Sequence, residues 1–208
     1  MSENTELYPR DNSISNDNDD FVTITDPNVE VTLPTLKYGY RTTKSNWDEL
    51  IQIIEVDYDI PRLSRSRAQQ HEYEVFRYHM KQQYRSTVDF ILISKFDFDA
   101  VLPSVAPNAN DEEDLERKWI AHPCLKDVQT PKTILVKNDF PYSVEDNIVH
   151  YVLWKIKEPI TQQEILDARE ELKSDKIKAL EILQWVNPPS LQSIPDIDHV
   201  HFLCRLSE

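Results

Sequence analysis

The fold is decided by residues 148–154, which read Ile148-Val149-His150-Tyr151-Val152-Leu153-Trp154. β-Branched and aromatic side chains dominate this run, and they are typical of a buried strand. Shorter runs of the same character predict further strands at residues 133–136, 182–186 and 199–204. The C-terminal half of the chain is therefore predicted to hold four strands.

A helix is predicted between the second and third of these strands. Thr161-x-x-Glu164 is a capping box, in which each side chain satisfies a backbone N–H at the helix start. The sequence pattern predicts that this helix ends at about Leu172.

Three more helices are predicted in the N-terminal half. Their starts are marked by capping residues, namely Ser45 or Asn46, Ser66 with Gln69, and Ser86. Helices followed by strand–strand–helix–strand–strand predict an α+β fold, with the N-terminal helices packed on a mainly antiparallel C-terminal sheet.

The domain organisation follows from changes in composition along the chain. Residues 1–20 are polar and acidic and predict a disordered tail, and the proline-broken residues 21–44 predict an extended arm. Residues 45–208 are then one domain. Residues 103–110 predict a loop, and the acidic run at 111–114 predicts the start of a short helix that ends at about Ile120.

The charge and composition exclude several classes of protein. The net charge is −14, of which residues 1–30 carry −7, and this acidity argues against a nucleic-acid partner or an anionic membrane surface. No apolar run approaches the roughly 20 residues of a membrane-spanning helix. Cys124 and Cys204 are isolated, so neither a disulfide framework nor a CxxC site is predicted. These features favour the cytoplasm or nucleus.

Glycine is nearly absent. The chain has one, Gly39, where average usage would give about fourteen. Glycine-rich phosphate loops and the GxSxG nucleophile elbow are therefore excluded. A phosphate site here must use side chains or turns without glycine.

The histidines are the first candidates for chemistry. In a strand, His199 and His201 project to the same face, where one imidazole can act as a nucleophile beside the other. Buried histidines satisfied by the backbone are the alternative. His150 could complete a three-histidine metal set only if the strands bring the rings together. We predict no cofactor and no metal.

Polar residues at turns are the second candidates. Asn138 and Asp139 precede Phe140-Pro141 and either form an Asx-type turn or bind a sugar hydroxyl. Asn187 before Pro188 has the same two interpretations. Tyr142 and Ser193 complete the predicted ligand-binding set.

Three segments together resemble a fungal family that is named for its induction by N-acetylglucosamine and built on a domain of unknown function. The segments are Leu63-Ser64-Arg65-Ser66 with Tyr73-x-x-Phe76 and 88–92, Asn138-Asp139-Phe140-Pro141-Tyr142 with 148–154, and Trp185-x-Asn187-x-x-x-Leu191-x-Ser193 with His199-x-His201. The resemblance covers about residues 45–206. It implies a cytoplasmic protein linked to amino-sugar metabolism or response.

The order of elements also resembles the histidine-triad (HIT-like) fold. In that fold the middle histidine attacks a nucleotide phosphorus, and this role would fall to His201. The third position of the triad is Leu203 here, and Leu191 stands where that fold usually has a glycine.

These observations leave three functional hypotheses. The first is a protein of N-acetylglucosamine metabolism or response that binds a sugar or nucleotide-sugar ligand. The second is a HIT-like nucleotidyl or phosphoryl hydrolase or transferase, with His201 as nucleophile and His199 supporting it. The third is a non-catalytic regulator that binds a protein partner through aromatic anchors around Phe140, Tyr142 and Trp185.

Overall fold

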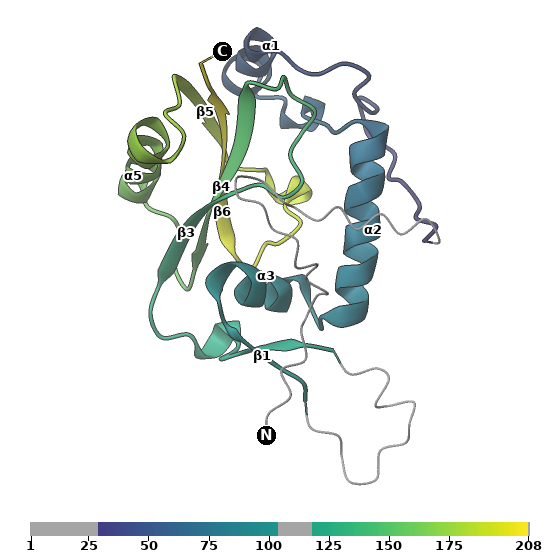
Figure 1. The fold of residues 1–208 in the computed structure, drawn as a ribbon, viewed down its shortest axis with the longest axis vertical. Helices are drawn as coiled ribbons and strands as arrows, with labels where there is room; N and C mark the ends of the chain where they lie inside the picture. The colour runs from purple at the N-terminus through teal and green to yellow at the C-terminus, as the bar shows by residue number, and fades with distance from the viewer. Residues whose placement is uncertain (1–28, 104–117, 208) are drawn as a thin grey trace, which may run out of the picture.

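The computed structural model describes residues 29–103 and 118–207. Within them, a four-stranded antiparallel sheet in the order β3-β4-β6-β5 is flanked by helices on both faces. Figure 1 shows α5 on one side of the sheet and α2 and α3 on the other. The α+β prediction, with N-terminal helices against a C-terminal antiparallel sheet, is confirmed.

The four predicted strands of the main sheet are all present. Their bounds are Lys132–Lys137 for β3, Ile148–Ile156 for β4, Glu181–Trp185 for β5 and Asp198–Arg205 for β6. β4 and β6 occupy the two central positions, which explains why their sequences are the most apolar.

The two faces of the sheet are distinguished by alternate residues of each strand. Tyr151 and Leu153 of β4 and Phe202 of β6 face α5 (Gln162–Glu171), which continues as η4 (Leu172–Lys176). His150, Val152 and Trp154 of β4 lie on the opposite face, together with His199, His201 and Leu203 of β6.

The N-terminal helices begin at the predicted caps. Asn46 caps α1 (Trp47–Ile51), which continues as η1 (Gln52–Val56), and a short η2 follows (Ile60–Arg62). Ser66 and Gln69 form the capping box of α2 (Arg67–Gln83), and Ser86 caps α3 (Thr87–Phe96). These side-chain caps explain why sequence alone locates the helix starts well.

Two apolar clusters lie on the face of the sheet opposite α5. One packs α2 and α3 against Ile134, Trp154 and Ile156, and the other packs α1 and η1 against Leu183 and Leu203. The strip of sheet between the two clusters is the region that contains the histidines.

The sequence missed a two-stranded sheet formed by β1 (Asp99–Val101) and β2 (Ile120–His122). The helix expected from 111 to about Ile120 lies mostly outside the described residues. Its expected end is wrong, because Trp119 bridges Tyr84 and Ile120 begins β2. Three-residue strands give too short a pattern to recognise.

Two further short elements, η3 (Leu125–Asp127) and η5 (Pro189–Leu191), are turns of 3-10 helix.

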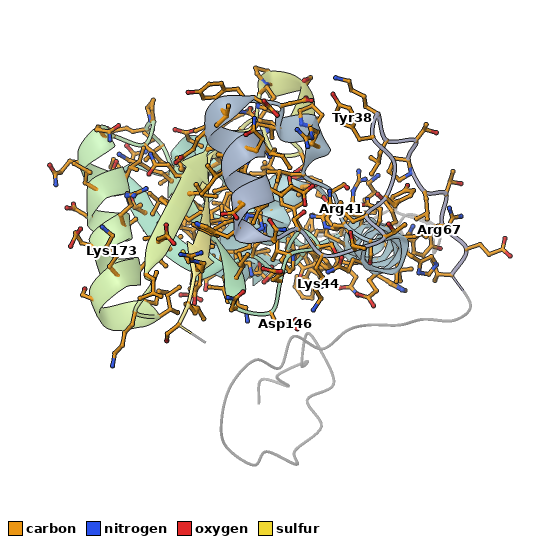
Figure 2. The ribbon with its side chains drawn as sticks, turned by 90° about the horizontal axis from the view of Figure 1, so that it is seen from above. Tyr38, Arg41, Lys44, Arg67, Asp146 and Lys173 are labelled. Atoms are coloured by element: carbon orange, nitrogen blue, oxygen red, sulfur yellow. The ribbon has the colours of Figure 1, made fainter. Side chains whose placement is uncertain are left out.

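The predicted acidic tail at 1–20 lies outside the described residues, as does the start of the predicted arm at 21–44. The described end of the arm lies against the domain through a bridge from Arg41 to Ser66. Seen from above, Arg41 and Arg67 lie on the opposite side of the molecule from Lys173 (Figure 2). No helix in the described part of the chain has the length and apolarity to cross a membrane.

Candidate functional site

Three histidines converge on one face of the sheet. His150 of β4 is 2% exposed, and His199 and His201 of β6 are 5% and 7% exposed. The centroids of the His150 and His201 rings lie 5.2 Å apart, and those of His199 and His201 lie 5.3 Å apart. We call these three residues the histidine cluster.

Two asparagines lie at opposite ends of this cluster. Asn187, just after β5, places its Nδ2 at 3.1 Å from Nε2 of His201. Asn138, just after β3, places its Nδ2 at 3.3 Å from both ring nitrogens of His150. Nε2 of His150 lies 3.1 Å from Nδ1 of His201 and so joins the two rings.

The hydrogen bonds assign the tautomer of His201. Nε1 of Trp185 donates to Oδ1 of Asn187 at 3.0 Å, so the amide nitrogen of Asn187 is the atom that faces His201. An amide nitrogen only donates, and Nε2 of His201 must therefore accept. The proton of the neutral ring is then on Nδ1, from which it is donated to Nε2 of His150.

This arrangement keeps both rings neutral. Burial lowers the pKa of His201 from 6.5 to about 3, with His199 and Arg65 contributing. Burial also lowers the pKa of His150 well below 6.5, with His201 and Arg65 contributing. A second proton on His201 would point at the amide hydrogens of Asn187, which agrees with the direction of its shift.

His199 is held differently. Its Nδ1 lies 2.9 Å from the carbonyl oxygen of Ile197, which can only accept, so the ring proton is on Nδ1. Its ring stacks on Trp154 at 4.7 Å between centroids. No residue in the described part of the chain forms a hydrogen bond with its Nε2.

Aromatic rings enclose the cluster. Trp185 stacks on His201 at 5.0 Å between centroids and 13° between planes, and Tyr142 stacks on His150 at 5.4 Å and 17°. Burial raises the pKa of the Tyr142 hydroxyl, while the charge of Arg65 and a hydrogen bond with Asn187 act in the opposite direction. The cluster thus combines neutral imidazoles, amides and flat apolar faces.

A half-buried cation lies beside these rings. Arg65 precedes α2, and its Cζ is 5.6 Å from the centroid of the Tyr142 ring. Burial lowers the pKa of Arg65. Its positive charge reaches both His150 and His201, because it contributes to the lowered pKa of each.

The remaining predicted site residues are placed as follows. Oδ1 of Asn138 accepts the backbone N–H of Phe140 at 2.9 Å, which is the Asx-type turn, while its amide reaches His150. Asp139 forms an ion pair with Lys95 of α3 at 2.5 Å. Ser193 is exposed in the loop before β6. The structure therefore brings Asn138, Tyr142 and Asn187 to the histidine cluster, whereas Asp139 pairs with α3.

Sequence reasoning missed Arg65 and Trp154 as site residues. Trp154 was recognisable in principle, because it lies four residues after His150 and so faces the same side of β4. Arg65 lies far from the three histidines in sequence. It reaches them because α2 packs against the sheet, and no local sequence pattern encodes that packing.

No group of three or more His, Cys, Asp or Glu side chains suited to a metal ion occurs within residues 29–103 and 118–207. A hollow lies at another part of the surface, where it is lined by Phe98, Pro123, Val128, Lys132 and Ile156 among others. None of the residues that line it belongs to the histidine cluster.

Comparisons with known proteins give a family model and a match to one solved structure. The solved structure is described as "Crystal Structure of HTC1"; it has a TM-score of 0.46 and 20% identity, and the match covers 81% of this chain and 86% of that one. The comparison with curated proteins finds no match. The family model for DUF3605, described as a protein of unknown function, matches residues 46–205, and the chain therefore belongs to the DUF3605 family.

Proposed function

We propose that this chain binds a sugar or nucleotide-sugar ligand at the histidine cluster, and that it acts in the cytoplasm in N-acetylglucosamine metabolism or response. The observation that carries the proposal is the convergence of His150, His201 and Asn187 on one sheet face. They form a polar strip in a layer that is otherwise apolar.

The chemistry of the strip suits a hydroxyl-rich ligand. Polar side chains are costly to bury unless they are hydrogen-bonded, and a purely structural layer at this position could be apolar. Amides and neutral imidazoles both donate and accept, as sugar hydroxyls do. The flat faces of Trp185 and Tyr142 add apolar surface beside those polar groups.

A thermal-shift screen tests this proposal. N-acetylglucosamine, its 6-phosphate, UDP-N-acetylglucosamine and free nucleotides are added separately to the full chain. At least one is expected to raise the melting temperature, and His201→Ala should abolish the shift. His71→Ala is the matched control, because His71 is exposed on α2. If no compound shifts the wild type, the remaining hypothesis of a regulator with a protein partner is favoured.

A second candidate function is HIT-like nucleotidyl or phosphoryl transfer. It is favoured by the tautomer of His201, whose Nε2 lone pair is the form that a nucleophilic histidine requires. In this reaction Nε2 forms a bond to phosphorus as the bond to the leaving oxygen breaks. His150 stabilises the resulting imidazolium through the Nδ1 proton, and Asn187 has to swing away from Nε2.

Trapping of a phosphorylated or nucleotidylated histidine tests the second candidate. The wild type is incubated with UDP-N-acetylglucosamine or a nucleoside triphosphate, quenched in base and analysed by mass spectrometry. An acid-labile adduct on His201 is expected. Turnover without an adduct on His201, or turnover that persists in His201→Ala, would rule this role out.

A further inference from the structure

Arg65 is tied to the protein by neutral acceptors. Its Nε and Nη2 donate to the carbonyl oxygen of Phe140 at 3.1 and 2.7 Å, and its Nη1 donates to Oε1 of Gln70 at 3.2 Å. None of these three hydrogen bonds neutralises the positive charge.

Three other cations near this region each have a carboxylate partner, whereas Arg67 lies over the ring of Tyr40, at 6.0 Å from its centroid. Arg41 pairs with Glu49 at 2.6 Å, and Arg62 pairs with Asp57 at 2.7 Å. Lys44 pairs with Asp146, and the two lie together at the edge of the molecule in Figure 2. Among the described residues, Arg65 takes part in no ion pair.

The α2 carboxylate whose charge acts on Arg65 is that of Glu74, and it is already hydrogen-bonded to other side chains. Glu74 accepts from Arg77 at 3.0 Å and from Nε2 of Gln70 at 2.8 Å. Glu74 is therefore paired with Arg77, and Arg65 is left without a carboxylate partner of its own, although the net charge of the chain is −14.

Aromatic rings hold both guanidinium groups in place. The Cζ atoms of Arg65 and Arg77 lie 4.4 and 5.6 Å from the centroid of the Tyr73 ring. Such cation–π contacts orient a planar guanidinium but do not neutralise its positive charge. Arg65 also lies over the ring of Tyr142, which stacks on His150.

We propose that Arg65, assisted by Arg77, is the anion-binding part of the ligand site, and that the ligand therefore carries a phosphate group. This inference rests on the proposed function and narrows it. The ligand is a sugar phosphate or a nucleotide sugar rather than a free sugar, with its phosphate at the guanidinium groups and its hydroxyls toward the histidine cluster.

Phosphate fits these observations better than a neutral group does. A guanidinium presents several N–H donors in one plane, which matches the oxygens of phosphate. A phosphate also supplies the counter-charge that the described surroundings of Arg65 lack. Because glycine-rich phosphate loops are excluded, side chains have to provide this binding.

Isothermal titration calorimetry of the full chain tests the inference. The ligands are N-acetylglucosamine, its 6-phosphate, UDP-N-acetylglucosamine and, as a carboxylate-bearing sugar, glucuronic acid. We expect a phosphorylated ligand to bind about 10- to 100-fold more tightly than N-acetylglucosamine and glucuronic acid, since charge-assisted hydrogen bonds contribute this much.

Three variants identify the residues responsible. Arg65→Lys keeps the positive charge but loses the planar guanidinium with its several N–H donors. Arg77→Gln removes the second guanidinium group. Each should weaken binding of the phosphorylated ligand about tenfold or more. Arg62→Gln removes a nearby charge that is paired with Asp57 and should leave binding unchanged. If Arg65→Lys does not fold, the binding affinity of Arg77→Gln for the phosphorylated ligand decides the test.

The possible results separate the two proposals. If N-acetylglucosamine or glucuronic acid binds as tightly as the phosphorylated ligands, the phosphate site is wrong and the ligand-binding function stands. If Arg77→Gln and a folded Arg65→Lys both bind like the wild type, the phosphate site is also wrong. If none of the four compounds binds, the proposed function and this inference fail together.

Discussion

At the residue scale, the main feature is a directional chain of hydrogen bonds. Trp185 donates to Asn187, Asn187 donates to His201, and His201 donates to His150. Each donor meets an acceptor only if both imidazoles are neutral. The chain therefore sets the protonation state of the site as well as its shape.

Replacement of Asn187 by aspartate should reverse the state of His201. A carboxylate facing Nε2 favours the protonated ring, so the pKa of His201 should rise from about 3, by about 1–3 units on the scale of opposite charges. Histidine side-chain NMR across a pH series measures the change. Asn147→Asp in the β3–β4 loop is the control, and an unchanged pKa in Asn187→Asp would contradict the hydrogen-bond chain.

The neutral state also predicts how stability depends on pH. The pKa of His201 is about 3 in the folded chain, below its ordinary 6.5. The unfolded chain therefore binds more protons between these values, so the contribution of this residue is complete above pH 6.5 and is lost progressively as the pH falls toward about 3.

Urea unfolding of the wild type and His201→Gln between pH 7 and pH 4 measures this contribution. The difference between their free energies of unfolding should shrink as the pH falls. Curves that stay parallel over this range would show that His201 is not a buried neutral base.

The candidate residues could be predicted from sequence only in part. His199 and His201 share a face by the geometry of a strand, and that relation needs no tertiary information. The contacts of His150 with His201, and of Asn138 with His150, depend on the strand order β3-β4-β6-β5, which residue spacing does not contain. Arg65 depends on how α2 packs, and it was missed for that reason.

At the element scale, local chemistry determines where helices begin. Both predicted capping boxes form, Ser66 with Gln69 and Thr161 with Glu164. Glu164 also accepts a hydrogen bond from the buried Lys155 at 2.9 Å, so α5 is tied to β4 through its first turn. Strand starts have no comparable side-chain signal, and the three-residue strands β1 and β2 were missed.

Loss of the cap of α5 should destabilise the fold measurably. Thr161→Ala removes the acceptor for the N–H of Glu164 and is expected to lower the free energy of unfolding by about 1 kcal/mol. Thr161→Ser keeps the hydroxyl and should cost little. Urea denaturation measures both, and equal stabilities for the Ala and Ser variants would contradict the assigned role of the cap.

At the scale of the whole molecule, the two faces of the sheet serve different purposes. The face under α5 is an apolar core in which Phe202 is fully buried. The opposite face holds the polar histidine cluster between two apolar clusters. Alternation along β6 thus predicts the division between core and site, while the N-terminal helices that enclose the site are placed by long-range packing.

This division predicts that the core can be weakened separately from the site. Phe202→Ala should lower the free energy of unfolding by about 3–5 kcal/mol, because it leaves a cavity under α5. Val186→Ala, at an exposed position, should change it by less than about 0.5 kcal/mol. Urea denaturation measures both variants, and a small effect of Phe202→Ala would contradict the assignment of this face as the core.

The most direct test of the ligand site is a titration of the full chain with UDP-N-acetylglucosamine, followed by NMR of the histidine side chains. The resonances of His150, His199 and His201 should shift together and saturate, while those of His71 and His122, both exposed, should stay in place. Saturating shifts confined to the exposed histidines, or no shift at any histidine, would contradict the account.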